Sequence, residues 1–207
     1  VMGRARTDDV QRRVYIAPAW VCPYEGPVAE DSVLRRVEEA LEAGASEIAL
    51  ADTIGHADPW SVRARCEAVG RRFGFGLLAV HLHDTQALGL ANAVAALDAG
   101  VCTLDGAIGG IGGCPFAPGA AGNVATEDLV HLAARLGFET GVDGSALAPV
   151  VAALDELLGR RVGGRTRAYH QSRKPPYLRS AEERSVQPSS VEPSSVEPRS
   201  PQTGGET

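Results

Sequence analysis

Short apolar runs alternate with amphipathic segments along most of the chain. The runs are nearly continuous in apolar character, which is typical of strands buried on both faces of a sheet. They span residues 14–17, 47–51, 77–81 and 101–105. Between and after them, the apolar positions follow helical spacing. This pattern predicts helices over residues 32–43, 58–72, 87–99, 126 onward and 146–158.

The ends of these predicted helices carry matching local signals. Gly44 and Gly100 follow two of them directly, where glycine commonly ends a helix. Asp58 and Pro59 open another helix as a cap and a first-turn proline. The acids within residues 126–128 lie in a first turn, where the helix dipole favours negative charge.

The regular alternation of strand and helix predicts an α/β fold with a parallel sheet and right-handed crossovers. Four such units correspond to half of a (β/α)8 barrel. An open doubly wound sheet fits the same pattern and stays an alternative. We expect residues 1–165 to form this partial barrel. Residues 166–207 are rich in Pro, Ser and Glu, with a five-residue repeat over residues 185–199, and this composition predicts a disordered tail.

Composition narrows the functional classes. The 207 residues suffice for one core, and the hydrophobic share of 44% is ordinary for a globular protein. The net charge of -6 argues against nucleic acid or an anionic membrane as a partner. No apolar run is long enough to cross a membrane, and the polar start lacks a signal-peptide core. Four cysteines without a CxxC motif predict reduced thiols in a cytoplasmic protein.

Polar side chains gather where the predicted strands end, which is the ligand-binding edge of a parallel α/β sheet. Asp52 ends the second strand, and His81 and His83 end the third. The fourth strand runs into a glycine-rich loop that contains Cys114 and reaches Asn123. We therefore expect the chemistry of this protein at that edge.

His81 and His83 are two residues apart, which places both imidazoles on one face of a strand. Two neutral imidazoles can bind one divalent metal, with an oxygen ligand completing the set. The alternative is one exposed histidine and one that is hydrogen-bonded within the core. Their position at the end of a buried strand favours the metal.

Cys114 and Asp52 each admit a functional and a structural interpretation. A cysteine between glycines can donate or accept a proton near a metal, whereas most free cysteines are small buried hydrophobes. Asp52 can act as a base or a metal-shell ligand, or it can cap the next helix. The glycines at residues 110–113 do not open a clear helix, so they are weak evidence for a dinucleotide site.

Four motifs together resemble the 3-hydroxy-3-methylglutaryl-CoA lyase family. They are CPYEGPV, LADTIG, LAVHLHDT and GGIGGCPFAPGAAGNVATEDLV, and the similarity runs from about residue 13 to 158. The resemblance implies the C-terminal half of a (β/α)8 barrel. Related synthases share the His-x-His strand but differ at Cys114 and Pro115, which favours the lyase branch.

The resemblance also implies a reaction, the retro-Claisen cleavage of an acyl-CoA substrate to acetyl-CoA and acetoacetate. His81, His83 and Asn123 would bind Mg²⁺ or Mn²⁺. Asp52, together with His81, would help to remove the hydroxyl proton of the substrate. Cys114 would protonate the acetyl-CoA carbanion.

The family's N-terminal half, with a metal-binding aspartate and a catalytic arginine, has no counterpart here. Val1 precedes Met2, so we expect either a non-standard start or missing upstream sequence. Three outcomes stay open for the half-barrel: a truncated remnant without catalysis, a chain that works with a separate N-terminal half, or a homodimer.

Overall fold

The computed structural model describes residues 10–113, 119 and 122–171. Within them, four parallel strands form one sheet in the order β1-β4-β5-β6. The strands are β1 (Arg13–Ile16), β4 (Glu47–Asp52), β5 (Leu78–Leu82) and β6 (Thr103–Asp105). The spatial order follows the chain order, as in a barrel. The predicted parallel α/β fold is confirmed.

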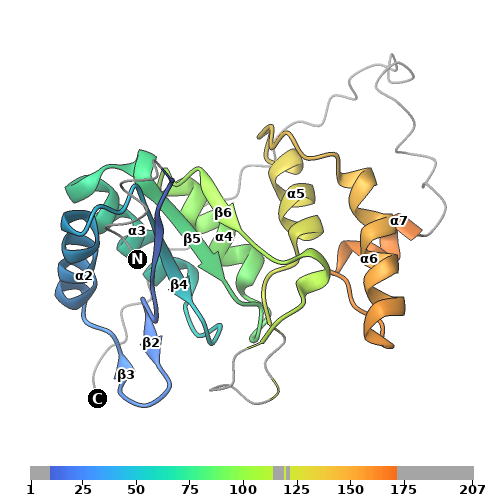
Figure 1. The fold of residues 1–207 in the computed structure, drawn as a ribbon, viewed down its shortest axis with the longest axis horizontal. Coiled ribbons are helices and arrows are strands. Elements are labelled where there is room, and N and C mark those ends of the chain that lie inside the picture. Colours follow the sequence, from blue (N-terminus) through green and yellow to red (C-terminus); the bar gives the residue numbers. More distant parts are fainter. Residues whose placement is uncertain (1–9, 114–118, 120–121, 172–207) are drawn as a thin grey trace, which may run out of the picture. The chain divides into compact units, whose positions relative to one another are not determined.

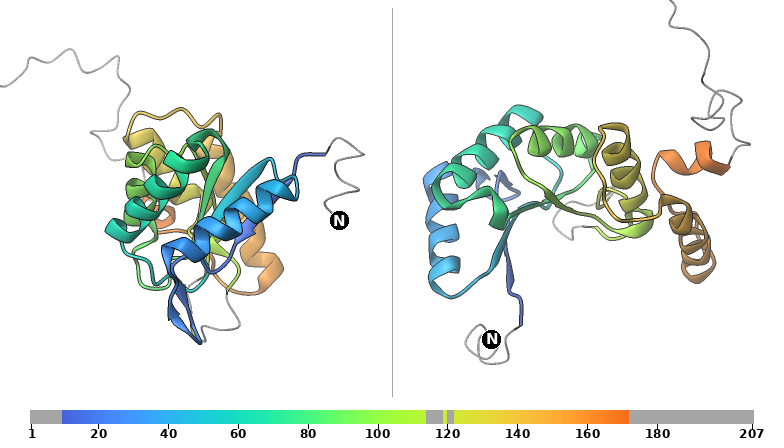
Figure 2. Two further views of the ribbon diagram at one scale, coloured as in Figure 1. Left: turned by 90° about the vertical axis from the view of Figure 1, so that its left-hand side faces the viewer. Right: turned by 90° about the horizontal axis from the view of Figure 1, so that it is seen from above.

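Three helices cover one face of this sheet, and no helix of the described part of the chain covers the other face (Figures 1 and 2). They are α2 (Glu30–Glu42), α3 (Pro59–Phe73) and α4 (Gly89–Asp98). Sequential parallel strands with right-handed crossovers place every connecting helix on the same side. A doubly wound sheet would carry helices on both faces. The described sheet is therefore half of a barrel, and the doubly wound alternative is wrong.

The two faces of the sheet differ in the polarity of their larger side chains. The helix face carries large apolar residues at paired positions, such as Ile48 beside Leu78 and Leu50 beside Val80. These four side chains belong to the main core together with residues of α2, α3 and α4. The opposite face, which we call the concave face, carries alanines and polar residues. They are Arg13, Tyr15, Glu47, Ala49, Ala51, Ala79, His81, Thr103 and Asp105.

Burial of the strands is less complete than the apolar runs predicted. Strand β4 is buried along nearly all its length, as expected. The two edge strands are not, and Tyr15 on β1 is 47% exposed. The prediction of burial on both faces is therefore wrong for β1 and β6, because none of the described elements covers the concave face at either edge.

The sheet is strongly curved. Tyr15 on one edge strand donates a hydrogen bond of 2.7 Å to Asp105 on the other. Three strand spacings of about 4.8 Å would keep these strands about 14 Å apart in a flat sheet. Side chains that stand upright on a flat sheet cannot bridge that distance. The curvature therefore brings both edges together over the concave face.

In the described part of the chain, a short 3-10 helix (Ile108–Gly110) and three α-helices follow β6, namely α5 (Thr126–Arg135), α6 (Gly144–Leu158) and α7 (Thr166–Gln171). The acids of the first turn of α5 bind other segments. Glu127 accepts hydrogen bonds from the backbone N–H of Gly109 and of Gly164. Asp128, only 5% exposed, accepts from the N–H groups of Arg165 and Thr166. These bonds tie the chain that precedes α7 to α5.

The predicted boundary between the partial barrel and the tail, at residue 165, therefore lies too early in the chain. Helix α7 occupies residues that composition assigned to the tail, because the Asp128 carboxylate satisfies the N–H groups at its start. The rest of the predicted tail, residues 172–207, lies outside the described residues.

Most predicted elements agree with the structure to within three residues at each end. Helix α3 begins after Asp58, whose carboxylate accepts from the N–H groups of Trp60 and Ser61. Helix α4 begins at Gly89, later than predicted, because Ala87 has a left-handed φ of 60° and Asp84 accepts from the Gly89 N–H. A short hairpin of β2 (Val21–Cys22) and β3 (Gly26–Pro27) was not predicted.

The cysteines within the described residues are reduced, as the sequence predicts. Cys22, Cys66 and Cys102 are free thiols. Burial raises the pKa of the Cys66 thiol to about 12, so this side chain behaves as part of the core. Over the described residues, no helix is long and apolar enough to span a bilayer.

Candidate active site

The end of β5 presents the two predicted histidines side by side. His81 is the fourth residue of the strand and His83 follows the strand directly. Their ring centroids are 5.1 Å apart with an interplanar angle of 64°. The prediction that alternation places both rings on one face is thus confirmed. His83 is 5% exposed, while the side chain of His81 is 20% exposed.

Asn123, at the end of the glycine-rich loop, lies beside the histidines at the end of β5. It forms an antiparallel bridge with His83. On either side, Asp84 donates to the Gly122 carbonyl at 2.8 Å and Val124 donates to the Leu82 carbonyl at 3.1 Å. Bridge partners point to the same side of the local sheet. The third predicted metal ligand therefore lies beside the second, 40 residues apart along the chain.

Two buried polar atoms at this bridge have no hydrogen-bond partner among the described residues. They are Nδ1 of His83 and Oδ1 of Asn123. The Asn123 amide is already oriented, because its Nδ2 donates to the Ile111 carbonyl at 2.9 Å. An unpaired buried polar atom costs about 1–3 kcal/mol, so two of them together need an explanation. An imidazole nitrogen beside an amide oxygen is a donor pair that fits a divalent cation.

The surroundings of His83 favour the neutral form of its imidazole. Burial, followed by the nearby His81, lowers the pKa of His83 below its ordinary value. The imidazole therefore stays neutral, and only the neutral ring has a lone pair for a metal. The core-satisfied alternative is wrong for His83, since the ring is buried but has an unpaired nitrogen.

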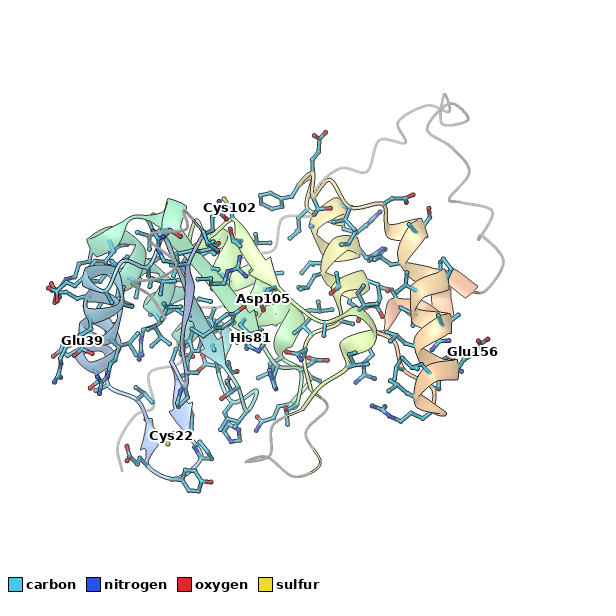
Figure 3. The ribbon with its side chains drawn as sticks, viewed as in Figure 1. Cys22, Glu39, His81, Cys102, Asp105 and Glu156 are labelled. Carbon is cyan, nitrogen blue, oxygen red and sulfur yellow. The ribbon has the colours of Figure 1, made fainter. Side chains whose placement is uncertain are left out.

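Asp105 is a site residue that the motif analysis missed. Its Oδ1 lies 2.5 Å from Nδ1 of His81, and its Oδ2 accepts a hydrogen bond of 2.7 Å from Tyr15 (Figure 3). Burial acts to raise the pKa of Asp105, but the hydrogen bonds from His81 and Tyr15 outweigh it and lower the pKa. Asp105 pairs in register with His81 at the end of β6. The signal available in the sequence was its place as the last residue of the predicted strand over residues 101–105, just as His81 ends the predicted strand over residues 77–81.

Asp52 occupies a different environment from the histidines. Its carboxylate accepts from the N–H of His56 at 3.0 Å and of Ala57 at 2.9 Å. It pairs in register with Leu82 on the helix face. The structure gives it no hydrogen bond to His81 or His83 within the described residues. The helix-cap alternative is wrong, because Asp58 caps α3. Its role as a base stays a prediction.

Cys114 lies outside the described residues, but the two ends of its loop are described. A Cβ on Gly112 would lie 2.6 Å from Nδ2 of Asn123. A Cβ on Gly122, whose φ is +91°, would lie 2.4 Å from the Gly112 carbonyl oxygen. Both positions require glycine, because the two ends of the loop meet in contact beside Asn123.

No cluster of three or more His, Cys, Asp or Glu side chains suited to a metal occurs in the described part of the chain. The candidate set of His81, His83 and Asn123 contains two imidazoles and one amide oxygen. The structure thus brings together the three predicted metal ligands, while the Asp52 carboxylate accepts from backbone N–H groups and interacts electrostatically with His83.

Comparisons with known proteins identify similar sequences and a similar fold. The sequence profile of the HMGL-like family matches residues 5–153. The chain is 46% identical over 155 residues to (R)-citramalyl-CoA lyase of Chloroflexus aurantiacus, covering 75% of this chain and 49% of that protein. The crystal structure of HMG-CoA lyase from Bacillus subtilis superposes with a TM-score of 0.79 at 38% identity, covering 82% of this chain and 57% of that one.

A second solved structure adds a ligand to this comparison. An HMG-CoA lyase from Acinetobacter baumannii in complex with coenzyme A and 3-methylmalate is 36% identical, with a TM-score of 0.76. It is matched over 84% of this chain and 56% of that chain. The chain spans about half the length of the curated relatives it matches.

Proposed function

Because this chain belongs to the HMGL-like family, we propose that it carries the metal-binding half of a carbon–carbon lyase site. The substrate is 3-hydroxy-3-methylglutaryl-CoA, which is cleaved to acetyl-CoA and acetoacetate. The observation that supports this proposal most is the pair of unpartnered buried atoms, His83 Nδ1 and Asn123 Oδ1. They lie at the carboxyl ends of parallel strands, where this class of fold places its chemistry.

His81, His83 and Asn123 would hold Mg²⁺ or Mn²⁺. When bound, the cation supplies positive charge that polarises the hydroxyl and carbonyl oxygens of the substrate. The chain's own residues do the rest. Asp52, with His81, assists removal of the proton from the substrate hydroxyl. The carbon–carbon bond then breaks, its electron pair passes to the acetyl-CoA fragment, and Cys114 delivers the proton that this fragment needs.

A second candidate substrate, (R)-citramalyl-CoA, is supported by the name of a similar protein. The relative at 46% identity is named for (R)-citramalyl-CoA, an acyl-CoA that also undergoes carbon–carbon cleavage. The two substrates differ by a single methylene, so one set of metal ligands and one proton donor serves either. Comparing both substrates with the same preparation separates these two forms of the proposal.

We also propose that the site works within a completed barrel. Strands β1 and β6 each pair on one side only within the described sheet. A groove of about 620 Å³ runs along the β1 edge, lined by apolar residues such as Val14 and Val33 and by charged ones such as Arg36 and Glu39. Another half-barrel, from a partner chain or from further residues of a longer protein, would cover this unpaired edge. A second copy of this chain is the other candidate.

The test is an assay of acetyl-CoA release by the full chain with Mg²⁺ or Mn²⁺, using both substrates. We expect Cys114→Ala to slow release by about 10²–10⁴-fold, because it removes a general acid. Cys102→Ala is the matched control, since Cys102 is an exposed thiol outside the site, and we expect it to retain the rate of the unmodified chain.

The assay is repeated with the N-terminal half of the Bacillus subtilis enzyme added. Turnover only in the mixture would support the partner-dependent form of the proposal. Where the unmodified chain turns over, alone or in the mixture, equal rates for the two cysteine variants would reject the lyase proposal. No release with either substrate in any mixture would reject it as well.

A further inference from the structure

The Asp105 carboxylate is held from three sides by groups on the concave face. Its Oδ1 lies 2.5 Å from Nδ1 of His81. Its Oδ2 accepts from the Tyr15 hydroxyl at 2.7 Å and faces a guanidinium nitrogen of Arg13 at 3.4 Å. Tyr15 and Arg13 come from β1, the opposite edge of the sheet. Nothing in the proposed chemistry above uses this carboxylate.

The contact with Asp105 determines which nitrogen of His81 carries the proton. An ionised carboxylate only accepts hydrogen bonds, so a neutral His81 must carry its proton on Nδ1. Nε2 is then left with a lone pair, and it has no hydrogen-bond partner among the described residues. Ligating histidines in metal sites commonly donate their other N–H to a carboxylate in this way.

Tyr15 restrains the same ring directly. Its ring meets that of His81 edge-on, with centroids 5.8 Å apart and an interplanar angle of 84°. One side chain thus both donates to the Asp105 carboxylate and limits rotation of the imidazole. Arg13 has a second anchor, because its Nε binds the Glu47 carboxylate at 2.5 Å. These contacts build a brace that spans all four strands of the sheet.

We propose that Asp105 is a positioning residue that sets the tautomer and orientation of His81, and that Tyr15 and Arg13 hold Asp105 in place. The proposal rests on the metal site proposed above, although its first prediction concerns the chain without metal. His83 provides a contrast within the same site. Its Nδ1 has no partner among the described residues, so no comparable carboxylate selects its tautomer.

The first test is imidazole ¹H–¹⁵N correlation NMR on the full chain, labelled with ¹⁵N-histidine, at a pH where the rings are neutral. We expect His81 as the Nδ1–H tautomer. Asp105→Asn should retain that tautomer, because the amide oxygen accepts the same bond. Asp105→Leu should lose it. The control is Asp98→Leu, which changes an exposed aspartate of α4 that pairs with Arg63.

Finding His81 as the Nε2–H tautomer in the unmodified chain would overturn the inference, and this result needs no variant to fold. Tyr15→Phe gives a milder test in case Asp105→Leu unfolds, and we expect it to increase exchange between the two tautomers. An unchanged His81 spectrum in every Asp105 and Tyr15 variant would equally contradict the inference.

Mn²⁺ titration of the same proteins, followed by electron paramagnetic resonance, separates this inference from the proposed function. We expect Asp105→Leu to weaken Mn²⁺ binding by about 10–100-fold and Asp105→Asn to weaken it less. If the unmodified chain shows the Nδ1–H tautomer but binds no Mn²⁺, the metal site fails and the positioning role of Asp105 on His81 stands.

Discussion

Replacing His83 with leucine is expected to lower Mn²⁺ affinity by at least about 100-fold and, at the same time, to leave the chain as stable or more stable. The loss follows from removing a metal ligand, because ligands contribute more than the outer residues, whose removal typically costs about 10–100-fold. The gain follows from the unpartnered Nδ1, whose burial costs about 1–3 kcal/mol without metal. Leucine has a similar volume and no polar atom.

The measurements are Mn²⁺ titration by electron paramagnetic resonance and urea unfolding of the metal-free chain. His131→Leu is the control, because His131 lies on α5 and outside the proposed ligand set. A structural histidine would give the opposite pair of results, with a loss of stability and little change in Mn²⁺ binding. That outcome would remove His83 from the proposed site.

Replacing Asp128 with alanine is expected to lower the free energy of unfolding by about 2–4 kcal/mol. The carboxylate is 5% exposed and accepts three hydrogen bonds, from Arg165 N–H, Thr166 N–H and the Thr166 hydroxyl. Alanine leaves these donors without their acceptor and opens a polar cavity, and each unsatisfied buried donor costs about 1–3 kcal/mol. Water that reaches some of these donors reduces the total cost below the sum of the three separate costs.

Urea unfolding followed by circular dichroism measures this change as a shift of the midpoint at constant slope. Asp128→Asn should lower the free energy of unfolding by less than Asp128→Ala, because the amide oxygen still accepts one or two of the hydrogen bonds. Glu139→Ala changes an exposed acid in the loop after α5, and we expect no measurable effect. A loss below about 0.5 kcal/mol for Asp128→Ala would show that the segment before α7 does not depend on this carboxylate.

The fold and most of the proposed metal site were predictable because local patterns determine them. Alternation within β5 fixes the relation of His81 to His83, and a proline with a capping aspartate fixes the start of α3. The resemblance to a family added Asn123, whose place beside His83 depends on a bridge across 40 residues.

What could not be predicted depends on contacts between distant segments. Helix α7 is short, and its first N–H groups bond to Asp128, 37 and 38 residues earlier. The brace on His81 needs the curvature of the sheet, which brings Tyr15 within 2.7 Å of Asp105 across 90 residues. No periodicity in the sequence carries information on that curvature. Strands β2 and β3 have only two residues each, too few for a pattern.

The most direct test of the proposed metal site is paramagnetic broadening of backbone amide signals as Mn²⁺ is added to the ¹⁵N-labelled full chain. We predict that the signals of residues 81–84 and 122–124 disappear first, at substoichiometric Mn²⁺, because His81, His83 and Asn123 surround the ion. Broadening that begins at exposed acids such as those of α2, or no selective broadening at all, would contradict a metal site at the end of β5.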